Sequence, residues 1–285
     1  MANLPPLGAH VSTAGGMPRS IENGCAISCT AIQVFVKNAN QWRGRSILAE
    51  EIAAFRTART GSAIGPVIAH ASYLINLAAT DPEILEKSKA ALADELSRCA
   101  DLGIEGLVLH PGAHLGTGEE EGIARAAASL NEIFAGLPDR GTRVLLENTA
   151  GQGSTLGWRL EQLEAIRSRL AEPERTGVCL DTCHAFAAGY AIHEPAGYEE
   201  FAAEVAERFG PALGAFHLND SVKPFASRRD RHEHIGEGLI GCSAFARLLA
   251  DPRFATVPMV LETEPGDDQA GLRKDLELLR RLVSV

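Results

Sequence analysis

Seven short apolar runs of this sequence have a histidine or a carboxylic acid as their last or next-to-last residue, and these residue types could hold metal ions. They are His10, His70, His110, Glu147, Asp181, His217 and Glu262. A single histidine in such a place is usually structural, but seven in corresponding positions are hard to obtain by chance. Imidazole and carboxylate groups are ligands for zinc and manganese, and clustered carboxylates repel one another without cations. The pattern therefore predicts a centre that holds several metal ions.

Two further segments carry residues of the same kind. His184 follows Asp181 by three residues, which is about one helical turn if the run passes directly into a helix. Asp230 and His232 lie two residues apart in the loop after His217. Such closely spaced pairs can hold one ion between them, although Asp230 and His232 taken alone would fit a solvated polar loop. These three residues extend the predicted ligand set.

The elements that position these residues follow from one repeated pattern: a short apolar run, a loop, and a segment with helical spacing. The runs cover residues 7–11, 31–36, 67–70, 106–110, 143–147, 177–181, 214–218 and 258–262. The helical segments include residues 83–102, 119–134, 162–170, 198–209 and 271–282. Alternating strands and helices indicate a parallel sheet, and eight such units in 285 residues fit a closed (β/α)8 TIM barrel. The carboxyl ends of its strands meet at one face, where we expect the active site.

An open, doubly wound sheet is the structural alternative to the barrel. No Gly-x-Gly-x-x-Gly follows the first run and no Gly-x-x-x-x-Gly-Lys occurs in the sequence, so the fingerprints of nucleotide-binding folds are absent. The sequence also has no low-complexity stretch, long linker or break in composition. We therefore expect residues 1–285 to form a single TIM-barrel domain.

Composition and charge narrow the class of protein. No apolar run reaches the roughly 20 residues of a membrane span, and the N-terminus does not read as a signal peptide, so we expect a cytoplasmic protein. The six cysteines are too few for a disulfide framework and are expected to be buried thiols. The net charge of −10 argues against nucleic-acid binding. Three divalent ions would add six positive charges and leave about −4.

Several blocks of sequence resemble the endonuclease IV family. They are GAHVS at residues 8–12, HASYLIN at 70–76, HPGAH at 110–114, ENTAGQG at 147–153, LDTCHA at 180–185, HLND at 217–220, DRH at 230–232 and GEG at 236–238. The matches run in order from Gly8 to Glu262 and so cover nearly the whole chain. Because several independent blocks agree in both sequence and spacing, the resemblance is specific.

The resemblance implies a centre of three zinc ions. By analogy, the first ion is held by His70 and His110, the second by Asp181, His217 and Glu262, and the third by His184, Asp230 and His232. Glu147 would bridge the first two ions and orient the attacking hydroxide, with Asp181 and Glu262 also placed at the reacting centre. His10 is not a ligand in the family, so we expect it to support the ligands or to face the substrate.

The family's reaction is implied in the same way. The resemblance predicts a DNA repair endonuclease that hydrolyses the phosphodiester bond 5′ to abasic sites in duplex DNA and leaves a 3′-hydroxyl. Removal of blocking groups from damaged 3′ ends, as a phosphatase or phosphodiesterase, is expected beside it. Attack by hydroxide held between metal ions needs no side-chain nucleophile. The family works as a monomer, which is therefore the expected state.

Loops at the mouth of the barrel are the candidates for contacts with DNA. Tyr73 and Leu74 follow His70 and could fill the gap left by a missing base, or they could cap the barrel core. The segment 37–43 after the second run is interpreted as a DNA-contacting loop, and basic residues gather in the loop after His217. The further candidates are Asn40, Gln41, Trp42, Arg43, Lys223, Arg228 and Arg231. Many relatives have arginine at the position of Asn40, which is shorter and uncharged.

Two other functions compete with this interpretation. A sugar isomerase or epimerase on a related barrel also gathers histidines and carboxylates at strand ends, but generally around one or two metal ions. A metal-stabilised barrel that binds DNA without cutting it is the second alternative. The nine-residue ligand set, and Asp230 with His232 above all, favours three ions and hydrolysis.

Overall fold

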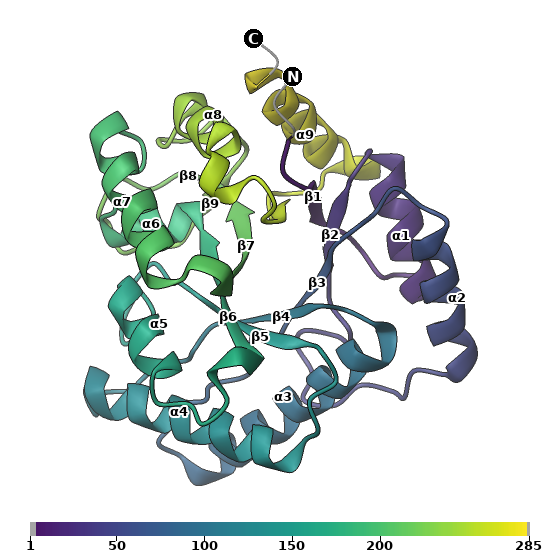
Figure 1. Ribbon diagram of the computed structural model, residues 1–285, viewed down its shortest axis with the longest axis vertical. Coiled ribbons are helices and arrows are strands. Elements are labelled where there is room, and N and C mark those ends of the chain that lie inside the picture. Colours follow the sequence, from purple (N-terminus) through teal and green to yellow (C-terminus); the bar gives the residue numbers. More distant parts are fainter. Residues whose placement is uncertain (1–3, 284–285) are drawn as a thin grey trace.

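Eight parallel strands close into a barrel at the centre of the computed structural model, which describes residues 4–283 (Figure 1). They are β1 (Leu7–His10), β2 (Ala31–Val34), β3 (Val67–His70), β4 (Gly106–Leu109), β5 (Arg143–Glu147), β6 (Thr176–Asp181), β7 (Leu213–Leu218) and β10 (Met259–Leu261). Strand β1 pairs with β2 on one side and with β10 on the other, so the sheet has no open edge. The predicted (β/α)8 TIM barrel is confirmed, and the open sheet is excluded.

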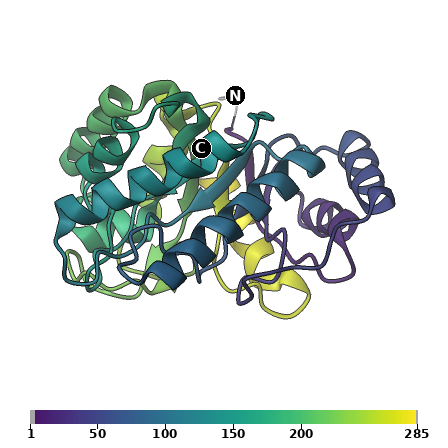
Figure 2. The same ribbon diagram turned by 90° about the horizontal axis from the view of Figure 1, so that it is seen from below.

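Helices surround the barrel (Figure 1), and α3 and α4 run next to each other along its outside (Figure 2). They are α1 (Met17–Ala26), α2 (Ala49–Thr60), α3 (Pro82–Leu102), α4 (Glu119–Gly136), α5 (Leu160–Arg167), α6 (Thr182–Ala188), α7 (Pro195–Arg208), α8 (Cys242–Ala250) and α9 (Ala270–Leu282). Short 3-10 turns precede β6, β7, β10 and α9. They are η1 (Pro173–Arg175), η2 (Gly210–Ala212), η3 (Pro252–Phe254) and η4 (Asp267–Gln269).

The five predicted helical segments correspond to α3, α4, α5, α7 and α9. Helix α7 begins at Pro195, ahead of the predicted start, because proline fits the first turn of a helix, where its missing N–H has no partner to lose. Helices α1, α2, α6 and α8 lie outside the predicted segments. In α2 the one buried residue is Phe55, and α6 has only seven residues, so neither shows a readable apolar stripe.

Two apolar layers hold the barrel and its helices together. The outer layer packs one face of the strands against the helices and includes fully buried rings such as Phe55 and Phe245. The inner layer fills the barrel with one residue from each of seven strands: Ala31, Ile68, Val108, Leu145, Cys179, Ala215 and Val260. The eighth strand has Gly8 at this level, where a β-carbon would stand 1.6 Å from the carbonyl oxygen of Ala31. The interior is therefore filled, and chemistry is confined to the barrel's ends.

All six cysteines are free thiols, as predicted. Cys29, Cys99, Cys179 and Cys183 are buried, but Cys25 is exposed and Cys242 is half-buried. The expectation of burial is therefore wrong for Cys25, which lies in the last turn of α1 on its outer side. Among the helices of residues 4–283, none combines the length and the hydropathy that crossing a membrane requires.

Candidate metal centre

Polar side chains, one for each of the eight strands, close the carboxyl end of the barrel. Each stands two residues beyond the residue that fills the interior, and side chains two apart on a strand point to the same face. They are His10, Gln33, His70, His110, Glu147, Asp181, His217 and Glu262. Seven of them are the strand-end residues singled out in the sequence. The eighth, Gln33 of β2, was not predicted.

Glu147 lies at the centre of this polar layer and is fully buried. Its Oε2 atom is 3.2 Å from Nε2 of His70 and 2.8 Å from Nε2 of His110. Its Oε1 atom is 2.8 Å from Nδ1 of His217. Nδ1 of His70 donates to the carbonyl of Ala71 at 2.8 Å, which fixes the ring and leaves Nε2 facing the carboxylate. The two oxygens of Glu147 therefore face different sets of imidazoles.

Gln33 forms hydrogen bonds with two of the predicted ligands and so fixes their orientation. Its side-chain oxygen is 2.8 Å from Nε2 of His217, and its nitrogen donates to Oε1 of Glu262 at 2.6 Å. Because Gln33 occupies Nε2 of His217, the other ring nitrogen points to the carboxylates, 3.2 Å from Oε2 of Glu262. The Gln33 nitrogen also lies 3.0 Å from Nδ1 of His10. Gln33 thus links His10 to His217 and Glu262 within the same layer.

A second group of potential ligands is carried by α6 and by the loop after β7. Helix α6 begins directly after β6, and Asp181 caps it by accepting from the backbone nitrogen of His184 at 2.7 Å. Nδ1 of His184 donates to the carbonyl of Asn148 at 2.9 Å, and its Nε2 is 3.2 Å from Oδ2 of Asp230. Nε2 of His232 is 3.2 Å from Oδ1 of the same carboxylate. The loop therefore brings Asp230 between two imidazoles.

The loop after β7 owes its shape to a small antiparallel pair, β8 (Asp220–Ser221) and β9 (His232–Glu233). The carboxylate of Asp220 is buried within the loop and ties both of its ends together. It accepts hydrogen bonds of 2.8–3.3 Å from the backbone nitrogens of Ser221, Gly236, Ile240 and Gly241. Asp220 therefore stabilises the loop that carries Asp230.

Two asparagines that the sequence analysis did not select also hold the ligands in place. Asn148 accepts from the backbone nitrogen of Asp181 at 2.6 Å and donates to its carbonyl at 3.2 Å. Asn219 donates to Oδ2 of Asp181 at 2.5 Å and accepts from the backbone nitrogen of Glu262 at 3.0 Å. Both follow a strand end by one position, which is the signal that would have marked them.

The potential ligand atoms form groups of a size that suits metal ions. Atoms within 4.8 Å of one another make up four such groups: His70, His110 and Glu147; Glu147, Asp181, His217 and Glu262; His184, Asp230 and His232; and Asp181, Cys183 and His232. Zinc ligands stand about 2.0–2.2 Å from the ion, so ligands of one ion lie at most about 4.4 Å apart. This separation is slightly shorter than the 4.8 Å within which the atoms of each group lie. Nε2 of His232 is buried without a hydrogen-bond partner, although two carboxylates are near it. A cation between these atoms would satisfy them.

The electrostatics of the cluster also suit cations. Burial alone would lower the pKa of His184, but the carboxylates of Asp181 and Asp230 outweigh it and raise the pKa to about 10. Burial is outweighed in the same way at His232, whose pKa rises to about 9. Burial would raise the pKa of Glu147, but the surrounding imidazoles hold it well below its usual value. Positive charge therefore stabilises the carboxylates of the site. Metal ions would supply this charge in place of the protons on the imidazoles.

Two hollows give access to the ligands. The larger, of about 730 Å³, is lined by Tyr73 and Glu262 among others. The smaller, of about 250 Å³, is lined by His110 and Asp230 among others. The Tyr73 residue is 63% exposed, and its ring centroid lies 5.4 Å from that of His70. A ligand at the mouth can therefore reach the polar layer past an exposed aromatic ring.

The residues predicted to contact DNA all lie on loops at this carboxyl end. The exposed ones are Asn40, Gln41, Arg43, Tyr73, Arg228 and Arg231, and the half-buried ones are Trp42, Leu74 and Lys223. Trp42 packs against the outer apolar layer, so much of its ring serves the fold. The loops after β2, β3 and β7 thus surround the mouth, as predicted from their position in the chain.

Two basic residues of these loops have partners inside the protein. The guanidinium of Arg228 lies 4.1 Å from the ring centroid of Trp158, which orders it at the surface. The ammonium of Lys37 lies 2.9 Å from Oε1 of Glu95, and the two side chains are only 2% and 1% exposed. The interpretation of the whole segment 37–43 as DNA-contacting is therefore wrong for Lys37.

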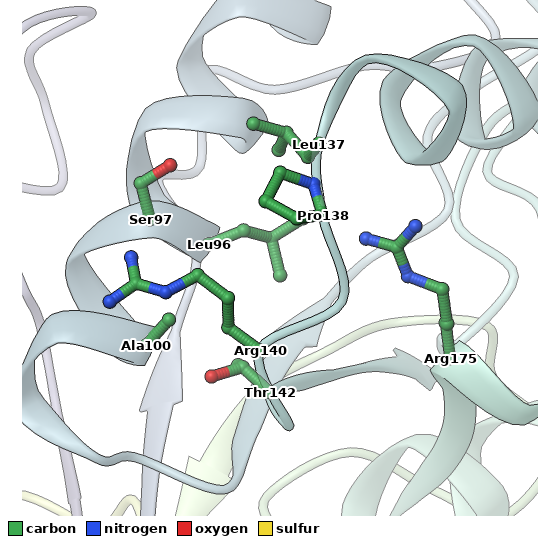
Figure 3. Close-up of a pocket in the computed structure, with 8 residues that line it drawn as sticks. All are labelled: Leu96, Ser97, Ala100, Leu137, Pro138, Arg140, Thr142 and Arg175. Atoms are coloured by element: carbon green, nitrogen blue, oxygen red, sulfur yellow. The ribbon is translucent and has the colours of Figure 1, made fainter.

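The opposite end of the barrel has a hollow of a different kind (Figure 3). It measures about 140 Å³ and is lined by side chains of α3, by residues 137–142 and by Arg175. The guanidinium of Arg175 donates to the carbonyl of Phe134 at 2.9 Å, and that of Arg140 pairs with Asp101 at 2.8 Å. None of the described residues that line this hollow is a histidine or an acid. The candidate chemistry is therefore at the carboxyl end.

Known proteins share both the fold and much of the sequence. The family model for xylose isomerase-like TIM barrels matches residues 25–282. Probable endonuclease 4 of Chloroflexus aurantiacus is 50% identical over 281 residues, covering 98% of this chain and 99% of its own. That of Halorhodospira halophila is 50% identical over 279 residues, covering 97% and 93%. The crystal structure of endonuclease IV from Thermus thermophilus is 37% identical with a TM-score of 0.86, covering 98% of each chain.

Other solved barrels are similar in fold alone. A D-tagatose 3-epimerase-like protein has a TM-score of 0.73 but only 19% identity, with 97% of this chain and 98% of its own covered. The endonucleases, in contrast, match in sequence over nearly their full length and over nearly all of this chain. The family recognised from the sequence motifs is confirmed: this chain belongs to the endonuclease IV family.

Proposed function

We propose that this protein is a DNA repair endonuclease that hydrolyses the phosphodiester bond 5′ to abasic sites in duplex DNA and leaves a 3′-hydroxyl. It also removes blocking groups from damaged 3′ ends. The observation that supports this most is the set of nine side chains that form three groups of potential metal ligands at the barrel mouth. Membership of the endonuclease IV family supports it independently.

The metal in this proposal is zinc, with three ions per chain. His70 and His110 would hold one ion, Asp181, His217 and Glu262 would hold another, Glu147 would contribute to both, and His184, Asp230 and His232 would hold the third. When bound, zinc supplies Lewis acidity, which makes water a nucleophile near neutral pH and offsets negative charge on phosphate oxygens. The donor set of nitrogen and oxygen atoms is one that zinc accepts.

The side chains themselves hold the reacting groups in place. Glu147 presents one oxygen to His70 and His110 and the other to His217, so it fixes two ligand groups at a constant separation. Its negative charge also orients the protons of the attacking water. Asp181 and Glu262 complete the reacting centre. None of these tasks needs a serine or cysteine nucleophile.

The loops at the mouth of the barrel would bind the DNA substrate. Chemistry on a sugar-phosphate inside a duplex requires that it leave the stack, and Tyr73 with Leu74 would fill the vacated space as wedge residues do in kinked DNA. Arg43, Arg228 and Arg231 are exposed around the mouth and would contact phosphates despite the net charge of −10. We also propose that residues 1–285 form one domain that acts as a monomer in the cytoplasm.

The runner-up is a sugar isomerase or epimerase. The solved epimerase-like barrel that resembles this chain does so at 19% identity, which speaks for the fold and not for the reaction. The group of His184, Asp230 and His232 is a third ligand set beyond the one or two ions that such chemistry generally uses. The ion content of the purified protein separates the two functions. Three ions per chain support the endonuclease, and one or two support the isomerase.

The direct test is incision of a labelled duplex that carries one abasic-site analogue, with an intact duplex as control. The protein is assayed as purified, after prolonged chelation, and after zinc is added back. We expect a single cut 5′ to the lesion that disappears on chelation and returns with zinc. A folded, zinc-replete protein that leaves the abasic duplex uncut would contradict the proposed function.

A further inference from the structure

An ion pair outside the polar layer, between Lys37 and Glu95, is almost completely buried. Lys37 belongs to the loop after β2, and Glu95 lies in the middle of α3, on the outside of the barrel. Their charged atoms are 2.9 Å apart, and the side chains are only 2% and 1% exposed. Desolvation offsets most of the attraction between charges buried to this extent, so the pair need not add to stability.

This ion pair joins two loops of the barrel mouth. The ammonium of Lys37 donates to the carbonyl of Gln41 at 2.6 Å, which closes the loop after β2 on itself. The carboxylate of Glu95 accepts from the backbone nitrogen of Ser72, in the loop after β3, at 3.2 Å and 3.3 Å. The hydroxyl of Ser72 in turn donates to the carbonyl of Ala39 at 2.5 Å. One carboxylate thus holds both loops in a single arrangement.

The two loops carry residues that the proposed function places against DNA. Arg43 is in the first loop, and Tyr73 directly follows Ser72 in the second. The backbone nitrogen of Leu74 donates to the hydroxyl of Ser72 at 3.3 Å. The segment that carries Tyr73 and Leu74, the proposed wedge residues, is therefore held by the same hydrogen-bond network. The side chains of Lys37 and Glu95 themselves are almost completely buried. They act through the backbone that presents the exposed side chains.

We infer that Glu95, with Lys37, is a positioning residue that sets the separation and orientation of the two DNA-contacting loops before DNA binds. This inference rests on the proposed function. A wedge and a phosphate-contacting loop that are ordered in advance lose less conformational freedom on binding, which strengthens binding without any new contact. Neither residue belongs to the groups of potential metal ligands, so the effect of the pair falls on the binding of abasic duplex and not on the rate at saturation.

The test compares Glu95→Gln with the double variant Lys37→Met/Glu95→Gln. The single variant leaves a buried lysine unpaired and risks the fold, whereas removal of both charges is often tolerated. Glu105→Gln is the matched control, because Glu105 also pairs with a cation, Arg59, and accepts a backbone N–H, from Val67 at 3.1 Å, but at the other end of the barrel. Incision kinetics on abasic duplex, metal content and melting temperature are measured for each.

For the double variant we expect KM to rise roughly tenfold or more, with kcat and metal content close to wild type. The Kd for abasic duplex, measured in a non-cutting Glu147→Gln background, should rise by the same factor. The Glu105→Gln control should leave all of these unchanged. An unchanged KM and Kd, or a fall in kcat and metal content at constant KM, would overturn the positioning role alone. A wild-type protein that does not cut abasic duplex would overturn the proposed function as well.

Discussion

The two ends of the barrel differ in how many charged side chains are buried close together. At the carboxyl end Glu147, Asp181 and His217 are fully buried and face one another across a small space. At the amino end the side chains of the pair Arg59 and Glu105 are 21% and 53% exposed, and the buried guanidinium of Arg175 donates to a backbone carbonyl. The same strands support both ends. The difference shows that the fold provides a common frame, while the carboxyl end gathers several buried ionisable groups around one another.

The physical consequence is a division of tasks. Exposed ion pairs contribute about 0–1 kcal/mol each to stability and can be replaced with little effect. Buried carboxylates are costly unless cations or hydrogen bonds compensate them. A residue that is expensive to bury and not required by the fold is retained for its chemistry. Variants at the two ends should therefore separate activity from stability.

The largest expected effect comes from Glu147→Gln. The amide has the same shape but no negative charge, and it presents an NH2 group where one oxygen now faces imidazoles. Incision of abasic duplex should fall roughly a thousandfold or more, while binding of the duplex is largely kept. Rate and Kd are measured on the same labelled duplex, with metal content determined in parallel. Incision at the wild-type rate would disprove the role assigned to Glu147.

A smaller effect is expected from Gln33→Leu. This variant tests whether the hydrogen bonds of Gln33 are needed to hold the predicted ligands in place. Leucine fills the space but loses the contacts to His217 and Glu262. Removal of such a partner typically costs about 10–100-fold in metal affinity or activity. Gln162→Leu is the matched control, because Gln162 is also buried but accepts a hydrogen bond from the backbone of Gly157 and not from a ligand side chain.

The two variants are compared by competition with a chelator and by incision rate. Gln33→Leu should lose metal at lower chelator concentration than wild type and cut more slowly. Gln162→Leu should lower the melting temperature without changing either property. Equal chelator sensitivity in both variants would show that Gln33 has no special part in holding the ligands.

The contrast between the two ends also explains what the sequence could reveal. Strand ends are local features, so His70, Glu147 and Asp181 could be placed at one face from the alternation of runs and helices alone. Gln33 obeys the same two-residue spacing from Ala31 but was overlooked, because an amide inside an apolar run is a weaker signal than an acid or a histidine. The spacing itself would have found it.

Contacts between distant segments could not be predicted in this way. Lys37 looked like a DNA contact because its loop is polar, and only the folded chain brings Glu95 of α3 against it. The four hydrogen bonds to Asp220 likewise depend on how the loop after β7 folds back on itself. Burial and pairing of this kind are properties of the tertiary structure, and a single sequence carries no local signal for them.

The smallest effect on activity is expected at the amino end, from Arg59→Met. Its guanidinium donates to the carbonyl of Gly103 at 2.8 Å and through two nitrogens to the carbonyl of Gly65 at 3.0 and 2.5 Å, besides pairing with Glu105. Methionine keeps the apolar stem but loses these bonds, so the free energy of unfolding should fall by about 1–2 kcal/mol. The exposed pair with Glu105 adds little to that loss.

Because this part of the barrel only supports the frame, kcat/KM on abasic duplex should stay within about twofold of wild type at a temperature where both proteins are folded. Urea unfolding followed by circular dichroism gives the stability, and the incision assay gives the activity of the same preparation. A large loss of incision with little loss of stability would show that the amino end influences the reaction. The separation of tasks between the two ends would then be incorrect, and coupling through the strands would have to carry the effect.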